Sequence, residues 1–315
     1  MAILNKNKKM FLTEKTVQKH FIPDKYLITQ VKYETKQVTS FIKKKGIEKN
    51  MQKNQLPIFI IGCPRSGTTL VRVILDSHPH ICCGPEMHVI SALESCQKQI
   101  TSKWKQLKPY GVSKDEFNKK ISEIYTVFLD RYIEEKKKKR WAEKTPENIF
   151  YVSFIDTLFP NCQFINVLRD GRDVVTSFKK RWGKAAIITG IKQWNKSAEL
   201  TCSYRKQFSS DRYFEVKYEN LVQRPEEETK KMMGFLGEEW TDELLNHHHT
   251  HHDFWFNYSK KTSKEQKKEK QPNRHSPSRP IFTSSVQQWK KDLNIIEKKL
   301  ITSKLKMNLL KLGYL

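Results

Sequence analysis

The sequence lacks the features of exported, membrane-spanning and disulfide-bonded proteins. No run of apolar residues approaches the roughly 20 that a membrane-spanning helix needs. The opening residues, MAILNKNKKMFLTEK, have no apolar core of a secretory signal. The six cysteines form no Cys-x-x-Cys pair and no disulfide-framework spacing, which argues against structural zinc, and we expect no bound metal. As written, the chain is expected to have no membrane span and to stay in the cytoplasm.

Acidic residues are too few to balance the basic ones, and the formal net charge is +25. Such a balance raises the possibility of a nucleic-acid partner. The excess, however, is mostly scattered lysine, without interleaved aromatic residues or a recognisable reading helix. We therefore expect no nucleic-acid partner. The main interpretation is a solvated basic surface, and the alternative is an attraction to anionic ligands or acidic partners.

Composition divides the chain into two parts. Residues 1–56 are rich in Lys, Gln, Asn and Thr with little apolar periodicity, so they are predicted to form a tail that is partly disordered or helical. Residues 57–315 are predicted to form one domain, with a flexible basic insert at about 259–280. No internal repeat is visible.

Short apolar runs alternate with amphipathic segments within the predicted domain. Strands are expected at 57–62, 159–170 and 212–221. Helices are expected at 68–78, 113–140, 226–236 and 295–311. This alternation predicts an α/β fold whose central parallel sheet carries helices on both faces.

The first predicted strand leads into a loop that is similar to a nucleotide-binding P-loop but lacks its lysine. Gly62 and Gly67 have the P-loop separation, and Thr69 stands where the motif places Ser or Thr. Thr68 occupies the lysine position, which removes the main means of handling a triphosphate. A glycine-rich turn at a helix N-terminus still binds tetrahedral anions, so we expect a phosphate or sulfate ligand.

Five stretches in sequence order resemble the motifs of the PAPS-dependent sulfotransferases, and among these the tyrosylprotein type. They are PRSGTTLVRVILDSHPHICCGPE (64–86), WAEKTP (141–146), RDGRDVVTS (169–177), VKYENL (216–221) and TSSVQQWKKDL (283–293). One such motif is weak evidence, but five in order are strong evidence. The resemblance implies a P-loop-like three-layer fold and sulfonate transfer from PAPS, with PAP as the product and no metal.

The resemblance assigns the glycine-rich loop to the 5′-phosphosulfate of PAPS. Its backbone amides and side chains hold the charged group, which has no β- and γ-phosphates and so no need of the P-loop lysine. The loop residues concerned are Arg65, Ser66, Gly67, Thr68 and Thr69.

Further residues match positions that the family uses on the nucleotide. Arg169 and Ser177 match its 3′-phosphate pair, and Arg181 and Tyr218 match other nucleotide contacts. Ser285, or the serine before it, completes the nucleotide lid. The alternatives are ordinary ones: a local ion pair for Arg169, a surface serine and a core tyrosine.

Two residues match the family's catalytic machinery, with Arg65 assisting from the loop. Glu86 falls at the general base, which takes the proton from the acceptor hydroxyl. Lys144 falls at the lysine that stabilises the leaving oxygen. A helix-start glutamate and a solvated lysine are the alternatives. Asp76 is the nearest competing acid, but it is expected to point away from the bound sulfate.

The chain departs from the tyrosylprotein type at several positions. His88 replaces a substrate-contacting arginine, which puts the acceptor in doubt. The resemblance implies that two family disulfides are absent. Cys83 matches one half of the first, but its partner position is Ala142, and Cys202 is near one half of the second, whose partner position is Tyr213. The histidine-rich stretch at 247–252 favours a low-complexity surface over a metal site.

These patterns predict a sulfotransferase that transfers sulfonate from PAPS to a hydroxyl. The leading acceptor is a tyrosine in an acidic protein or peptide, because a basic surface attracts one. A small-molecule or carbohydrate hydroxyl is the alternative acceptor. A catalytically inactive anion-binding module is the alternative of another class. The family resemblance also leaves a homodimer and a Golgi location open.

Overall fold

The computed structural model describes residues 56–254 and 279–315. The predicted tail at 1–56 and most of the predicted basic insert at 259–280 lie outside these residues, so both stay predictions. None of the helices within the described ranges is long and apolar enough to cross a membrane.

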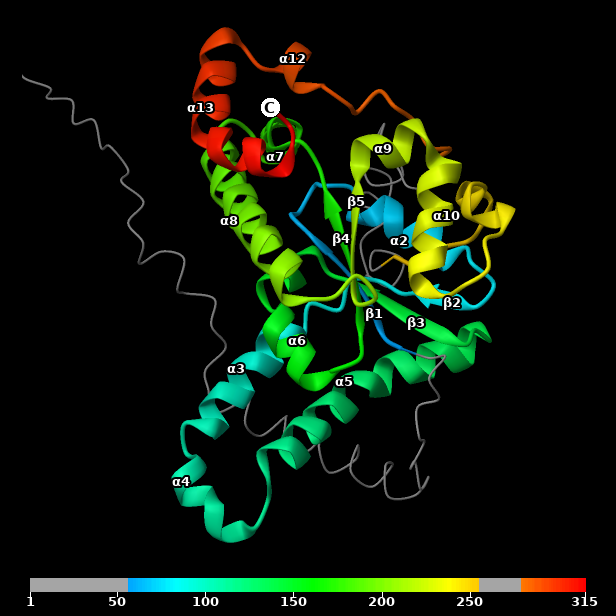
Figure 1. Cartoon of the computed structure of the whole chain (residues 1–315), viewed down its shortest axis with the longest axis vertical. Helices are drawn as coiled ribbons and strands as arrows, with labels where there is room; N and C mark the ends of the chain where they lie inside the picture. The colour runs from blue at the N-terminus through cyan, green and yellow to red at the C-terminus, as the bar shows by residue number, and fades with distance from the viewer. Residues whose placement is uncertain (1–55, 255–278) are drawn as a thin grey trace, which may run out of the picture. The chain divides into compact units, whose positions relative to one another are not determined.

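A five-stranded parallel sheet forms the centre of the fold (Figure 1). Its strands lie in the order β2-β3-β1-β4-β5, and every neighbouring pair is parallel. The strands are β1 (Ile58–Gly62), β2 (Ile81–Cys83), β3 (Arg140–Lys144), β4 (Gln163–Leu168) and β5 (Tyr213–Lys217).

Helices and single turns connect the strands and cover the sheet. The principal helices are α2 (Thr68–Asp76), α3 (Ile90–Thr101), α4 (Trp104–Leu107), α5 (Lys114–Lys136), α6 (Val152–Leu158), α7 (Gly171–Trp182), α8 (Ala186–Gln207), α9 (Tyr218–Gln223), α10 (Pro225–Leu236), α12 (Trp289–Asp292) and α13 (Ile295–Leu312). The 3₁₀ turns are η2 (Lys108–Tyr110), η3 (Pro146–Phe150), η4 (Asp242–Leu244) and η5 (His247–His249).

The two faces of the sheet are buried in two different apolar clusters. Successive side chains of β1 point to opposite faces, so Ile58 and Ile60 pack with α2 and α10. Phe59 and Ile61 pack with side chains of α5 and α6. Both sets are fully buried, which explains why β1 is apolar throughout. The predicted parallel sheet with helices on both faces is confirmed.

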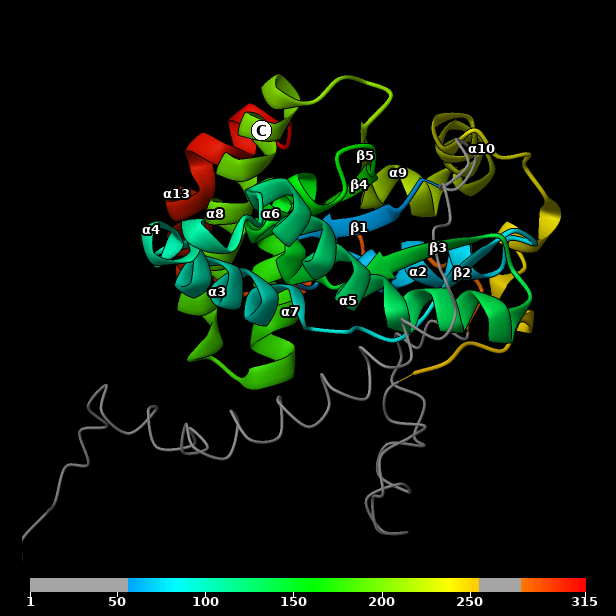
Figure 2. The same cartoon turned by 90° about the horizontal axis from the view of Figure 1, so that it is seen from below.

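A third cluster joins α7, α8 and α13, which Figure 1 shows on the side of the sheet away from α10. Figure 2 shows α3, α4 and α5 close together, viewed from below. The site described next depends on α7, because this helix follows β4 directly and carries two of the predicted nucleotide contacts.

Several predicted boundaries were wrong. The helix expected at 113–140 ends at Lys136, and the chain re-enters the sheet as β3. The strand expected at 212–221 ends at Lys217, so Tyr218 begins α9 and does not lie on a strand. Strands β2 and β3 were not predicted, because β2 has three residues and β3 contains three charged side chains.

Candidate functional site

The loop between β1 and α2 turns its backbone toward the carboxyl edge of the sheet. Arg65 and Gly67 both have positive φ angles, +74° and +107°, and the N–H of Ser66 donates to the carbonyl of Cys63 at 3.0 Å. No described side chain caps the N-terminus of α2. Its first N–H groups therefore remain available to an anion, as the sequence predicts for this loop.

Tyr218 packs directly on the glycine of this loop. A Cβ atom on Gly67 would lie 2.4 Å from Cδ2 of Tyr218, closer than any real contact. The guanidinium carbon of Arg169 lies 4.4 Å from the centre of the same ring. Only glycine allows the loop to approach the tyrosine this closely, and Tyr218 thereby connects the loop to Arg169.

Arg169 follows β4 and holds two other predicted site segments. It donates to the carbonyl of Arg65 at 3.1 Å and to the carbonyl of Ser285 at 2.7 Å. Nε of Arg65 in turn donates to Oγ of Ser177 on α7 at 3.0 Å. Four predicted nucleotide-binding residues from distant parts of the sequence therefore meet at one edge of the sheet.

The site concentrates positive charge. Partial desolvation of its guanidinium lowers the pKa of Arg65, and the positive charges of Arg169 and Arg181 lower it further. Three cations that repel one another at close range are stabilised by an anion placed among them. Arg181 belongs to the site by this electrostatic contact, although it is exposed near the end of α7.

Two buried polar atoms fit the same ligand. Oγ of Ser66 and Nε of Arg169 are buried and have no hydrogen-bond partner among the described residues. Such atoms are costly unless something satisfies them. Both belong to the predicted phosphosulfate and 3′-phosphate contacts, so the residues present fit PAPS, a nucleotide with two separate anionic groups.

The predicted base and the predicted lysine touch each other. Oε1 of Glu86 accepts a hydrogen bond from Nζ of Lys144, which also donates to Oγ1 of Thr69 at 3.3 Å. The side chain of Lys144 is 3% exposed and that of Glu86 is 27% exposed. Lys144 therefore joins the glycine-rich loop to Glu86, and the carboxylate remains partly exposed.

His88, which sequence reasoning noted only as a departure, lies on the other oxygen of the base. Its Nε2 is 3.0 Å from Oε2 of Glu86. Its backbone has φ of +55°, which is uncommon for a residue other than glycine. Glu86 and His88 are two residues apart in a loop, and this spacing does not predict that their side chains are in contact.

A buried carboxylate on β3 fixes the segment that carries Glu86. Burial raises the pKa of Glu143, which accepts hydrogen bonds from Oγ1 of Thr145 at 2.5 Å and from Nδ2 of Asn148 at 2.6 Å. The backbone of Met87 also donates to Glu143. Glu143 and Thr145 were not identified from the sequence. Both are adjacent to Lys144 in the sequence, and because side chains alternate along an extended chain, they point to the face opposite Lys144.

The competing acid, Asp76, is committed elsewhere. It is buried, and its two oxygens accept from the backbone N–H of Cys83 at 2.8 Å and pair with Nδ1 of His252 at 2.5 Å. The prediction of a low-complexity surface at 247–252 is wrong for His252 and for His247, because both are buried. His252 is accommodated in the interior because its two ring nitrogens pair with the carboxylate of Asp76 and the carbonyl of His247.

The cysteines match the expectation that the two family disulfides are absent. All six cysteines are free. Cys83 on β2 lies in register with Ala142 on the neighbouring strand β3. The residue next to Cys83 on the neighbouring strand is therefore Ala142, the position at which the resemblance places the partner cysteine.

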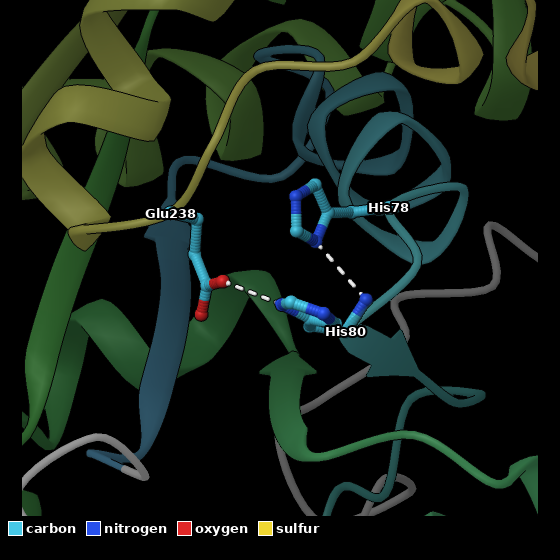
Figure 3. Close-up of side chains that lie close together, drawn as sticks. All are labelled: His78, His80 and Glu238. Carbon is cyan, nitrogen blue, oxygen red and sulfur yellow. Dashed lines mark hydrogen bonds and ion pairs between the residues drawn. The ribbon is translucent and has the colours of Figure 1, made fainter.

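Two histidines and a glutamate gather away from this site, with their ligand atoms within 4.8 Å of one another (Figure 3). The ring of His78 contacts the carbonyl of Glu239 at 2.9 Å and the N–H of His80 at 3.2 Å. The ring of His80 contacts Glu238 at 3.2 Å and the ammonium of Lys139 at 3.0 Å. Because every ring nitrogen is engaged and a lysine lies on one of them, the cluster is an anchor for the start of β2.

Comparisons with known proteins agree with this geometry. Residues 57–242 match the profile of the sulfotransferase family. A protein-tyrosine sulfotransferase of Drosophila melanogaster is 34% identical over 206 residues, covering 60% of this chain and 40% of the relative. Protein-tyrosine sulfotransferase A of Caenorhabditis elegans is 31% identical over 202 residues, covering 60% and 52%. The chain therefore spans about half the length of these relatives or less.

Solved structures show the same fold. The sulfotransferase domain of the Synechococcus PCC 7002 olefin synthase superposes with a TM-score of 0.53 at 20% identity, covering 83% of this chain and 98% of that domain. The sulfotransferase domain from the curacin biosynthetic pathway gives 0.52 at 20% identity, covering 80% and 98%. The family profile matches more than half of the residues of this chain, and the chain therefore belongs to the sulfotransferase family.

Proposed function

We propose that the protein is a PAPS-dependent sulfotransferase that acts on tyrosine in an acidic protein or peptide. The observation that carries the proposal is the contact of Glu86 with Lys144 directly beside Thr69 of the anion-binding loop. A proton acceptor, a cation and an anion cradle at one point are the parts that group transfer between two oxygens needs.

The chain would hold the two charged ends of the nucleotide with different elements. The loop amides, with Arg65, Ser66 and Thr68, would grip the 5′-phosphosulfate. Arg169 and Ser177, already joined through Arg65, would hold the 3′-phosphate. Because these contacts come from backbone amides and arginines, we propose that binding needs no magnesium.

PAPS supplies the sulfonate group when it is bound, and the remaining chemistry belongs to side chains of this chain. Glu86 would take the proton from the acceptor hydroxyl, which is a poor nucleophile while protonated. Lys144, buried beside it, would neutralise negative charge on the leaving oxygen. Glu86 and Lys144 form one ion pair, so the proton acceptor and the cation lie next to each other, as these two roles require.

An acidic acceptor follows from charge and from the relatives. The formal net charge of +25 favours encounter with acidic partners, and the named relatives are protein-tyrosine sulfotransferases. The homodimer and the cellular location stay predictions.

The nucleotide part is tested by calorimetry of PAP, AMP and ATP, each with and without magnesium. We expect tight binding of PAP in both conditions and much weaker binding of ATP. Equal affinity for PAP and AMP would reject the 3′-phosphate site, since the two differ by that phosphate alone.

The acceptor part is tested with labelled PAPS and a panel of acidic tyrosine peptides, simple phenols and sugars. We expect transfer to at least one peptide and none to sugars. Turnover of phenols or sugars with none on any peptide would reject the tyrosine acceptor and leave sulfonate transfer standing. If no compound in the panel received sulfonate, the proposed sulfotransferase activity would be rejected.

A further inference from the structure

The two carboxylate oxygens of Glu86 contact two different kinds of group, an ammonium and an imidazole. Oε1 contacts the ammonium of Lys144, whose side chain is 3% exposed. Oε2 contacts Nε2 of His88 at 3.0 Å, and the side chain of His88 is 57% exposed. Glu86 therefore lies between a buried cation and an imidazole that reaches solvent.

Only one of these two neighbours can receive a proton from Glu86. An ammonium group carries three protons and has no lone pair, so Lys144 donates and cannot accept. A neutral imidazole accepts a proton on one nitrogen and donates one from the other, so it can pass a proton on. The proposed base must lose its proton after every turnover, and the group that contacts the oxygen not paired with Lys144 is His88.

The surroundings keep this arrangement in place. The backbone N–H of His88 lies 3.5 Å from Oγ1 of Thr145, which donates to the buried carboxylate of Glu143. The charged groups that act on Glu86 are Lys144 and Arg65 on one side and Glu143 behind the segment. None of these three is placed to lead a proton from Oε2 to water, whereas the exposed ring of His88 is.

We propose that His88 relays the proton of the acceptor from Glu86 to solvent. The proposal rests on the sulfotransferase function proposed above. As the new S–O bond forms, the acceptor O–H bond breaks and its proton moves to Glu86, while the leaving phosphate oxygen keeps the electron pair of the old S–O bond. Neutral His88 with its proton on Nδ1 then takes the proton from Oε2 on Nε2, and Nδ1 releases its own proton to water. Before the next turnover, exchange of the exposed ring with water moves the proton from Nε2 back to Nδ1, so that Nε2 can accept again.

The rival explanation is that His88 only orients Glu86 by a hydrogen bond. His88→Gln separates the two, because glutamine offers an N–H to the carboxylate but cannot carry a proton. We expect His88→Gln and His88→Ala to lower kcat about 10- to 100-fold, below the range for loss of the base itself. His249→Gln, an exposed histidine outside the site, is the matched control and should keep wild-type turnover.

Added base distinguishes relay from orientation in His88→Ala. We expect imidazole and its methylated derivatives to restore turnover, with the restoration rising with the basicity of the added base. Calorimetry should show PAP affinity within about twofold of wild type, because no nucleotide contact is changed. In the free protein, Glu86→Gln should shift the NMR signals of the His88 ring, and Glu94→Gln on α3 should not.

Each outcome decides the question. Wild-type turnover in His88→Gln, or a loss that no added base restores, would overturn the relay while leaving the sulfotransferase function intact. Unchanged His88 signals in Glu86→Gln would remove the contact on which it rests. Absence of transfer by the wild-type chain on every acceptor would overturn the proposed function and the relay together.

Discussion

At the scale of single residues, the proposed base, Glu86, can be tested separately from the proposed nucleotide contacts. Glu86→Gln keeps the shape and the hydrogen bonding of the side chain but removes the proton acceptor. We expect turnover with labelled PAPS to fall by about 10²–10⁴-fold, the usual contribution of a general base. PAP affinity should stay close to wild type, because the predicted nucleotide contacts lie on other residues.

The matched control for this substitution is Glu94→Gln. Glu94 pairs with Lys98 on α3 and has no contact with Lys144. It should leave both turnover and PAP affinity unchanged. If Glu86→Gln lost PAP binding in parallel with activity, Glu86 would be a structural part of the nucleotide site and not its base.

Arg169 is the proposed contact for the 3′-phosphate of the nucleotide. It contacts the carbonyls of Arg65 and Ser285 and the ring of Tyr218. Arg169→Ala should weaken PAP by about 1.5–3 kcal/mol, the range for hydrogen bonds to charged groups. AMP should be weakened less, because it has no 3′-phosphate.

Calorimetry of PAP and AMP checks this expectation, with Arg205→Ala as the control. Arg205 pairs with Glu215 on the surface and is remote from the loop contacts. An equal loss for PAP and AMP would mean that Arg169 supports the fold of the site and does not read the 3′-phosphate.

Most residues of the candidate site were named from sequence motifs, and their roles toward a ligand stay predictions. Arg65 was predicted from the stretch at 64–86, and Arg169 and Ser177 from the stretch at 169–177, and the structure brings the three together. The contact of Glu86 with His88 was not predictable, since it depends on a left-handed residue in a loop. The sequence motifs predict the class of reaction. The partners of the two oxygens of Glu86, Lys144 and His88, depend on backbone geometry that the motifs do not contain.

At the scale of elements, the turn between β1 and α2 requires glycine at position 67. Gly67→Ala would place a methyl group 2.4 Å from Tyr218 in a backbone conformation that costs other residues about 1–3 kcal/mol. We expect the loop to shift and PAP binding to be lost, while the rest of the sheet stays folded. Calorimetry of PAP together with circular dichroism measures both.

Gly234→Ala is the control for this element. Gly234 lies in α10, where an added Cβ meets nothing within 4 Å, so the substitution should preserve PAP binding. Unchanged PAP affinity in Gly67→Ala would show that the close approach of Tyr218 has no part in nucleotide binding.

The same scale explains which elements the sequence predicts. Strands β1 and β4 are buried on both faces and read as continuous apolar runs. Strand β3 is equally buried but contains Arg140, Glu143 and Lys144, each with a polar or charged partner inside. Periodicity cannot reveal a strand whose polar side chains are buried against partners that only the folded chain brings into contact.

At the scale of the whole molecule, buried histidines tie the segment after α10 to the helix of the anion loop. His252 connects Asp76 at the end of α2 to the carbonyl of His247, with 2.9 Å between Nε2 and that oxygen. His247 is fully buried. The stability of this connection therefore depends on His247 remaining neutral.

That dependence has a defined sign. Burial, followed by the charges of His248 and His252, lowers the pKa of His247 from 6.5 to about 4. Between these values the unfolded chain binds the proton more readily, so the free energy of unfolding rises with pH and is lost as pH falls from about 6.5 toward 4. At about 1.4 kcal/mol per pKa unit, the loss amounts to about 3 kcal/mol.

His247→Gln should remove this part of the pH dependence, because glutamine does not titrate. Urea unfolding between pH 4 and 7.5 measures it as the difference between the curves of the wild type and the variant. The two curves should approach each other as the pH falls, since acid destabilises only the wild type through this group. The exposed His249→Gln should instead run parallel to wild type. A difference between wild type and His247→Gln that stays constant across this range would show that His247 does not link proton uptake to unfolding.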